Sequence, residues 1–231
     1  MPGTLYIVAT PVGNLGDITL RAIETLKKVD LILCEDTRHT LPLLTRFGIK
    51  KPLISYHQHS SAAKIKEIVN LLNEGKKLAL VTDAGTPGIS DPGNLLIEEL
   101  LKKDSGLKII PLPGATALIA ALSVSGFPAD KFYFAGFPPQ KKKRRAFFED
   151  LAGRRETVVF YESPRRILKT LDELGEILGP RHEIMAAREL TKHFETIYRG
   201  SLDSVEEKIK KDSPRGEFVV LIKKEGKTSQ N

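Results

Sequence analysis

The chain has 231 residues, of which 41% are hydrophobic and 28% are charged, so collagenous, coiled-coil and disordered proteins are excluded. No apolar run approaches the roughly 18 residues that span a bilayer, and the N-terminus has no basic signal-peptide segment. The single cysteine, Cys34, excludes a disulfide framework. The formal net charge of +7 is concentrated after Leu112 and favours a polyanionic partner such as a nucleic acid. We therefore expect a soluble, cytoplasmic protein.

In the first half, short apolar runs alternate with amphipathic stretches, a pattern typical of an α/β fold with largely parallel strands. Strands are predicted at 4–9, 31–34, 53–56, 78–82 and 107–112. Helices are predicted from residue 20 onward, with Asp17 or Thr19 as the cap, and at 40–47, 62–73 and 94–103. The sequence Pro111-Leu112-Pro113-Gly114 interrupts this alternation. We therefore expect two domains, at 1–112 and 113–231.

The second half continues the alternation and begins with a helix of small residues at 115–124. Strands are predicted at 132–135, 157–161, 183–188, 195–200 and 217–223, and helices at 141–152, 164–178 and 201–211. Ser163 and Pro164 fit the cap and the first residue of the middle helix. The tail at 225–231 is expected to fray. The expected fold class is thus α/β, with two α/β domains.

The most informative segment is the loop at 81–93, VTDAGTPGISDPG, which follows a predicted strand and precedes a helix that Asp91 and Pro92 should begin. Its glycines allow unusual backbone conformations and a close approach to a ligand. It is neither a P-loop nor a GxGxxG motif. The loop at 9–17, ATPVGNLGD, leaves the first strand in a similar way. Because ligands bind at the carboxyl ends of strands in α/β sheets, both loops should open on one edge of the sheet.

A polar cluster, LCEDTRHT, follows the second predicted strand. Its Glu35 and Asp36 are candidate catalytic residues that would accept the proton of a hydroxyl, with Arg38 orienting them or gripping a phosphate. The alternative is a purely structural Asp–Arg pair. The nearby histidines His39, His57 and His59 lack the carboxylate or cysteine partners of a metal site, so no metal is expected. The second half lacks the Gly-x-Ser-x-Gly motif of a serine hydrolase.

A run of basic residues begins the helix predicted at 141–152, close to several phenylalanines. It is either an edge that contacts RNA or an ordinary solvated helix face. The candidate RNA-binding residues are Arg38, His39, Lys141, Lys142, Lys143, Arg144, Arg145, Arg165 and Arg166.

Several segments together are similar to the tetrapyrrole methylase superfamily, and most of all to its branch of small-subunit ribosomal RNA methyltransferases. They lie at 6–17, 34–40, 82–93, 111–117, 160–166, 188–195 and 216–222 and extend in order over nearly the whole chain. The resemblance implies methylation, with S-adenosylmethionine as the cofactor, of the 2′-hydroxyl of a cytidine in the decoding region of 16S ribosomal RNA. It also implies a homodimer whose two α/β domains hold the cofactor in the cleft between them.

The resemblance further assigns the cofactor contacts. In the first domain they fall on the first loop and the glycine loop, and in the second on the start of the small-residue helix, on two strands and on a loop. These residues are Pro11, Asp83, Ala84, Gly85, Thr86, Ile89, Ser90, Thr116, Ala117, Phe160, Tyr161, Glu189 and Phe218.

The chain departs from the tetrapyrrole-modifying branch in both loops. Its first loop reads Thr10-Pro11-Val12-Gly13-Asn14 where that branch has Gly-x-Gly-Pro-Gly, and Thr82-Asp83-Ala84 replaces Gly-Asp-Pro. Both changes disfavour a porphyrinoid substrate. Two alternatives stay open, a small-molecule methylase of the same fold and a non-catalytic RNA-binding factor of ribosome assembly.

Overall fold

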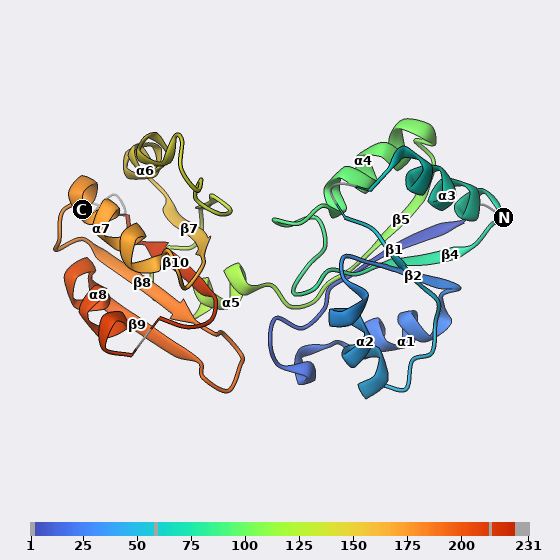
Figure 1. Cartoon of the computed structure of the whole chain (residues 1–231), viewed down its shortest axis with the longest axis horizontal. Helices are drawn as coiled ribbons and strands as arrows, with labels where there is room; N and C mark the ends of the chain where they lie inside the picture. Colours follow the sequence, from blue (N-terminus) through green and yellow to red (C-terminus); the bar gives the residue numbers. More distant parts are fainter. Residues whose placement is uncertain (1–2, 58–59, 213, 225–231) are drawn as a thin grey trace, which may run out of the picture. The chain divides into compact units, whose positions relative to one another are not determined.

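The structure is a computed structural model that describes residues 3–57, 60–212 and 214–224. The tail at 225–231 that was expected to fray lies outside these ranges. The chain forms two compact units, Met1–Thr116 and Ala117–Asn231 (Figure 1). The boundary therefore lies slightly beyond the predicted one at Leu112. The reason is that the intervening residues still contact the first unit, where Thr86 Oγ1 donates a hydrogen bond to the carbonyl of Ala115.

The first unit contains one parallel sheet with the strand order β3-β2-β4-β1-β5. Its strands are β1 (Thr4–Val8), β2 (Leu31–Cys34), β3 (Leu53–Ser55), β4 (Lys77–Leu80) and β5 (Lys108–Leu112). Its helices are α1 (Leu20–Lys28), α2 (Thr37–Arg46), α3 (Ala62–Asn73) and α4 (Gly93–Lys103), with a short 3-10 turn at Leu15–Asp17. The predicted parallel pairing is confirmed for this unit.

Helices cover both faces of this sheet, with α1 and α2 on one side and α3 and α4 on the other (Figure 1). Strand β1 shows how the sequence achieves this. Leu5 and Ile7 pack with the α3 and α4 residues, whereas Val8 packs with α1 and α2. Since successive strand side chains point to opposite faces, a strand buried on both faces needs apolar residues on both, as Leu5, Ile7 and Val8 supply here.

Side-chain caps begin three of these helices. Thr19 accepts a hydrogen bond from the amide of Ala22, Asp36 begins α2, and Ser61 begins α3. The prediction for α4 is wrong in detail, because Pro92 rather than Asp91 is the N-cap residue. The Asp91 carboxylate accepts hydrogen bonds from the amides of Gly88 and Gly93 instead and so fixes the loop before the helix.

The second unit contains a mixed sheet with the strand order β6-β7-β10-β8-β9. Its strands are β6 (Phe132–Phe134), β7 (Thr157–Glu162), β8 (Glu183–Arg188), β9 (Thr196–Ser201) and β10 (Phe218–Ile222). Only β6 and β7 pair in parallel, so the expectation of largely parallel strands is wrong here. The loop between β8 and β9 is too short to hold the crossover helix that a parallel pair requires.

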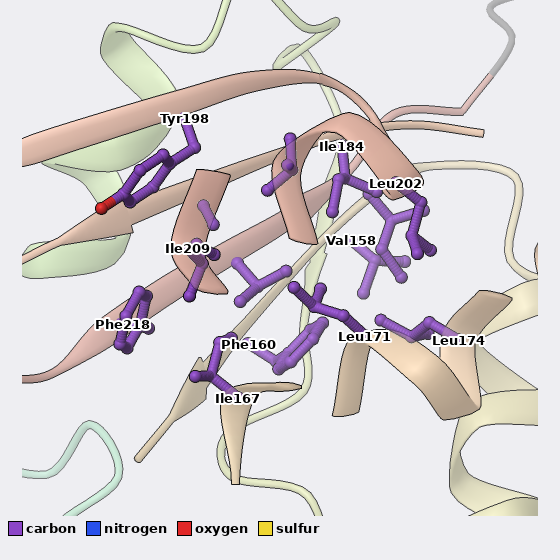
Figure 2. Close-up of a cluster of buried hydrophobic side chains, with 14 of the residues drawn as sticks. Val158, Phe160, Ile167, Leu171, Leu174, Ile184, Tyr198, Leu202, Ile209 and Phe218 are labelled. Atoms are coloured by element: carbon purple, nitrogen blue, oxygen red, sulfur yellow. The ribbon is translucent and has the colours of Figure 1, made fainter. Parts of the chain in front are cut away.

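Four helices surround this sheet: α5 (Ala117–Ser123), α6 (Arg144–Gly153), α7 (Ile167–Leu178) and α8 (Leu202–Lys211). The main core lies between the sheet and the last three helices, where Val158 and Phe160 of β7 meet Leu171 and Leu174 of α7 (Figure 2). Residues on the opposite face of the sheet, such as Val159, pack against α5.

Two α/β units confirm the expected fold class. None of the helices that the structure describes is long and apolar enough to cross a membrane.

Helix α7 begins later than predicted. Its N-cap residue is Arg166, and residues 163–166 form a turn before it. The Ser163 hydroxyl accepts a hydrogen bond from the Arg166 side chain, so it does not cap a helix amide. The predicted helix start at Ser163 and Pro164 is therefore wrong.

Candidate functional site

The two glycine-bearing loops of the first unit are joined directly. The amide of Thr10 donates to the carbonyl of Gly85 at 2.8 Å, and the amide of Gly85 donates back to Thr10 at 3.1 Å. The Thr10 hydroxyl also donates to the carbonyl of Thr82 at 3.0 Å. Strands β1 and β4 are neighbours in the sheet, which brings the ends of both strands together. The expectation that both loops open on one edge of the sheet is thus confirmed.

The glycine loop at 82–93 contains three residues with left-handed backbone conformations. Gly85 has φ +86°, Gly88 has φ +89°, and the non-glycine Ser90 has φ +61°. A Cβ built on Gly85 would meet only the carbonyl of Ala115, at 3.8 Å. This position therefore needs glycine for its backbone conformation rather than for lack of space.

Several of the predicted cofactor contacts lie on the surface of this loop. Asp83, Ala84, Ile89 and Ser90 are exposed, and the Ile89 side chain is the most apolar of them. Thr86 is half-buried, and Gly85 and Pro11 are buried. Among the described residues, the Ala84 amide has no hydrogen-bond acceptor. The loop thus offers a free backbone donor beside an exposed apolar side chain.

Asp83 connects this loop to helix α2. Its Oδ1 accepts a hydrogen bond from the amide of Asp36 at 3.3 Å, and its Oδ2 lies 2.7 Å from Nδ1 of His39. The hydrogen bond from the His39 ring to the Asp83 carboxylate raises the pKa of His39 above its ordinary value. Sequence reasoning placed Asp83 and His39 in different sites and missed this pair. The signal was present, because both residues follow strands that are neighbours in the sheet, β4 and β2.

Asp36 and Arg38 form the structural pair that the sequence left open as an alternative. The Asp36 carboxylate accepts from the amide of Arg38 at 2.8 Å and from two guanidinium nitrogens of the same residue, the closer at 2.6 Å. These hydrogen bonds lower the pKa of Asp36 to about 2. A carboxylate with so low a proton affinity, and with both oxygens in use, is a weak base.

Glu35 has the opposite electrostatic environment. Its side chain is partly buried, and burial together with the charges of Asp83 and Asp91 raises its pKa above the ordinary value. Neighbouring carboxylates whose pKa values are pushed apart in this way differ in chemical role. Of the two predicted catalytic carboxylates, Glu35 is therefore the better proton acceptor near neutral pH.

Among the described residues, no group of three or more histidine, cysteine, aspartate or glutamate side chains is arranged to hold a metal ion. His59 lies outside the described residues. Cys34 is buried, and burial raises the pKa of its thiol.

The cofactor contacts predicted in the second unit are placed less favourably. Phe160 and Phe218 lie in the hydrophobic core with 0% and 1% exposure, so their side chains do not reach solvent (Figure 2). The Glu189 carboxylate accepts from the amide of Glu217 and from Lys192 Nζ, both at 2.9 Å. Tyr161 is half-buried, as are Thr116 at the end of the first unit and Ala117 at the start of α5.

The basic run is divided by the start of helix α6. Lys141, Lys142, Lys143 and Arg145 are exposed, whereas Arg144 is only 6% exposed. The Arg144 guanidinium turns inward to Glu173, with Nε at 2.5 Å from Oε2. The prediction that Arg144 binds RNA is therefore wrong. A charge run read along the sequence does not show which member of it the helix buries.

The family profile of the Tetrapyrrole (Corrin/Porphyrin) Methylases matches residues 4–206. The chain belongs to this family. A relative from Thermotoga maritima named "Ribosomal RNA small subunit methyltransferase I" is 48% identical over 220 residues, which cover 95% of this chain and 98% of the relative. A relative of the same name from Synechocystis sp. is 48% identical, with 95% of this chain and 78% of the relative covered.

Solved structures support the fold. A diphthine synthase superposes with a TM-score of 0.73 at 13% identity, covering 96% of this chain and 90% of that one. Such a low identity speaks for the fold alone. As a member of the tetrapyrrole methylase family the chain is a methyltransferase, so the alternative of a non-catalytic RNA-binding factor is not favoured.

Proposed function

We propose that this tetrapyrrole-methylase family member transfers a methyl group from S-adenosylmethionine to the 2′-hydroxyl of a cytidine in the decoding region of 16S ribosomal RNA. The observation that carries the proposal is the identity of 48% over 95% of the chain to relatives named as small-subunit ribosomal RNA methyltransferases. The two loops that differ from the pattern of the tetrapyrrole-modifying branch support an RNA substrate over a porphyrinoid one.

The loops of the first unit fit S-adenosylmethionine. Gly85 holds the left-handed backbone conformation of the loop, and a side chain there would extend from a Cβ that already contacts the Ala115 carbonyl at 3.8 Å. The Ala84 amide offers a hydrogen-bond donor, and the side chain of Ile89, 46% exposed, offers apolar contact for an adenine ring. When bound, S-adenosylmethionine supplies an electrophilic methyl group on a sulfonium centre. The loop residues would hold it through backbone groups that the Thr10–Gly85 hydrogen bonds keep in place.

Glu35 is the candidate general base. A ribose hydroxyl is a weak acid, so a group that accepts its proton during methyl transfer assists the reaction. The raised pKa of Glu35 makes it the stronger acceptor of the two neighbouring carboxylates. Asp36 would act as a positioning residue that orients Arg38. The alignment of the two reactants supplies much of the remaining acceleration.

The other parts of the proposal are supported by the family resemblance. The predicted cofactor contacts that we keep are Tyr161, Glu189, Thr116 and Ala117. We no longer propose contacts from the side chains of Phe160 and Phe218, because they are buried. The exposed cations of the basic run, together with Arg165, stay predicted RNA contacts, as do Arg38 and His39. A homodimer acting in the cytoplasm completes the proposal, and sedimentation analysis of the purified protein tests the dimer.

Transfer of a labelled methyl group to alternative acceptors tests the substrate class. The purified enzyme is incubated with methyl-labelled S-adenosylmethionine and with small subunits that lack the modification, with large subunits, or with a reduced porphyrinoid. We expect label only in the small subunits. Label in the porphyrinoid alone would instead support the small-molecule methylase.

A further inference from the structure

The segment at 136–143 in the second unit presents an aromatic side chain to solvent. Phe137 is 54% exposed. Its ring lies 5.4 Å, centroid to centroid, from that of Tyr161, which in turn meets Phe134 edge-on at 5.0 Å. Aromatic contacts of this kind hold a ring in a defined orientation. Phe137 is thus an exposed ring supported by Tyr161, whose own ring is held by Phe134.

The backbone on both sides of Phe137 is held by hydrogen bonds. The carbonyl of Gly136 accepts from the amide of Tyr161 at 2.9 Å. The carbonyl of Pro138 accepts from Arg166 Nη1 at 3.0 Å, and that of Pro139 accepts from Arg144 Nη1 at 3.0 Å. Proline also fixes its own backbone dihedral angle φ. An exposed loop with this many restraints is unusual, because loops normally owe their mobility to unpaired backbone groups.

The two arginines are themselves anchored on a buried carboxylate. Glu162 has a fully buried side chain whose Oε1 lies 2.7 Å from Arg166 Nη2. Its Oε2 accepts from Thr170 Oγ1 at 2.7 Å and lies 3.7 Å from Arg144 Nη2. Burying charges costs free energy that their mutual attraction often fails to recover. The Arg144–Glu162–Arg166 network is therefore poorly explained by stability alone, whereas holding the 136–143 segment gives it a role.

Exposed positive charge lies on the same short segment of the chain as the ring. Lys141, Lys142 and Lys143 follow Phe137 closely and are all exposed. Arg165, in the turn before α7, is exposed beside Arg166. Arg145 adds less positive charge, because its Nε lies 3.0 Å from the Glu149 carboxylate, which neutralises it. An aromatic ring with several adjacent cations is the combination by which proteins bind single-stranded nucleic acids, with bases stacked on the ring and phosphates on the cations.

We propose that Phe137 stacks against an unpaired base of the RNA substrate, that Lys141–Lys143 contact the adjoining phosphates, and that Arg144, Glu162 and Arg166 position this surface. The inference rests on the proposed function, because it takes the partner to be RNA. It adds a specific recognition element outside the cofactor loops.

RNA binding by variants tests the proposal. A fluorescein-labelled, unstructured single-stranded RNA is titrated with the full chain at several salt concentrations. We expect Phe137→Ala to weaken binding by roughly 5- to 100-fold, the range that loss of one stacking ring produces. Phe137→Trp should retain affinity. Phe132→Ala is the matched control, since Phe132 is also an exposed phenylalanine of this unit, at 38%. This variant should bind the RNA with the affinity of the wild type.

Salt dependence separates the ring from the cations. Replacing all three lysines with glutamine should reduce the slope of log affinity against log salt by about 2, at roughly 0.7 per phosphate contact on a single strand. Phe137→Ala should leave that slope unchanged. Arg166→Lys keeps the positive charge but loses the planar guanidinium that contacts both Glu162 and the Pro138 carbonyl. It should weaken RNA binding several-fold and leave the affinity for S-adenosylmethionine unchanged.

The outcomes distinguish this inference from the proposed function. Wild-type RNA affinity in Phe137→Ala, with normal methyl transfer by the unaltered enzyme, would overturn the stacking proposal alone. Loss of S-adenosylmethionine affinity in the same variant would also overturn it, since the ring would then serve the cofactor. RNA binding that depends on Phe137 in an enzyme that methylates no ribosomal RNA would support the stacking proposal and refute the proposed function.

Discussion

His39 and Asp83 are joined by a hydrogen bond of 2.7 Å between Nδ1 and Oδ2. His39 lies in the first turn of helix α2, which follows β2, and Asp83 lies in the glycine loop, which follows β4. The bond therefore links the segment that carries Glu35, the candidate base, to the segment that carries the candidate cofactor contacts. Any change in this pair is expected to alter both.

The His39–Asp83 pair should be visible in a pH titration. Asp83 raises the pKa of His39 above its ordinary value of 6.5. Proton NMR of the histidine ring should show this raised value, and Asp83→Asn should return it toward 6.5. An unaltered His39 pKa in that variant would contradict the pairing.

The same shift gives stability a pH dependence of known sign. The pKa of His39 is higher in the folded state than in the unfolded state, where it is near 6.5. The His39–Asp83 pair therefore contributes fully to stability below the unfolded pKa, and this contribution is lost as the pH rises through the folded pKa. Urea unfolding should give a higher free energy of unfolding for the wild type than for Asp83→Asn at acidic pH. The difference between the two proteins should become smaller at alkaline pH. A difference that grows there would contradict this sign.

Glu35 and Asp36 should differ in their effect on catalysis. Glu35→Gln should lower kcat by about 100-fold or more, the contribution expected of a general base, with little change in S-adenosylmethionine affinity. Asp36→Asn should cost less, because asparagine still caps α2. The wild-type rate should rise with pH through a pKa above 4.5, the ordinary value for Glu35. A larger loss in Asp36→Asn than in Glu35→Gln would reverse the assignment.

Gly85→Val should abolish S-adenosylmethionine binding while the protein stays folded. The substitution forces a β-branched side chain onto a backbone with φ +86°, from a Cβ that lies 3.8 Å from the Ala115 carbonyl. Gly48→Val is the matched control, because Gly48 has φ +64° and nothing near its missing Cβ. Calorimetric titration should show binding in the Gly48 variant alone. Equal binding by both variants would remove the glycine loop from the cofactor site.

Gly216 should be indispensable for the packing of Glu189. A Cβ at Gly216 would lie 2.3 Å from the Glu189 side chain, and the backbone φ of +79° disfavours any other residue. We expect Gly216→Ala to lower the free energy of unfolding by about 1–3 kcal/mol. Gly153→Ala, where nothing lies within 4 Å, should be neutral or stabilising. Equal effects in urea unfolding would contradict the steric account.

Local patterns in the sequence were sufficient for most of the first unit. The helix α3 falls at Ala62–Asn73 as predicted, because Ser61 caps it and its apolar residues recur with helical spacing. The adjacency of the two glycine loops followed from parallel strands, whose carboxyl ends share one edge of the sheet.

Features that depend on tertiary contacts were not predictable in this way. The direction of a strand such as β9 is set by its neighbours, and apolar runs look alike in parallel and antiparallel sheets. Arg144 resembles the lysines before it until α6 packs on α7 and buries it against Glu173. Likewise, the pairing of Asp36 with Arg38, rather than with a substrate, depends on side-chain geometry that spacing does not give.

The most direct test of the account is where the transferred methyl group lies in the RNA. Unmodified small subunits are labelled by the enzyme with methyl-labelled S-adenosylmethionine, and their RNA is then digested completely in alkali. A 2′-O-methyl group blocks the hydroxyl that alkali uses to cleave the chain, so the account predicts label in one alkali-resistant dinucleotide that begins with cytidine. Label found only in mononucleotides, or no label in the RNA, would contradict it.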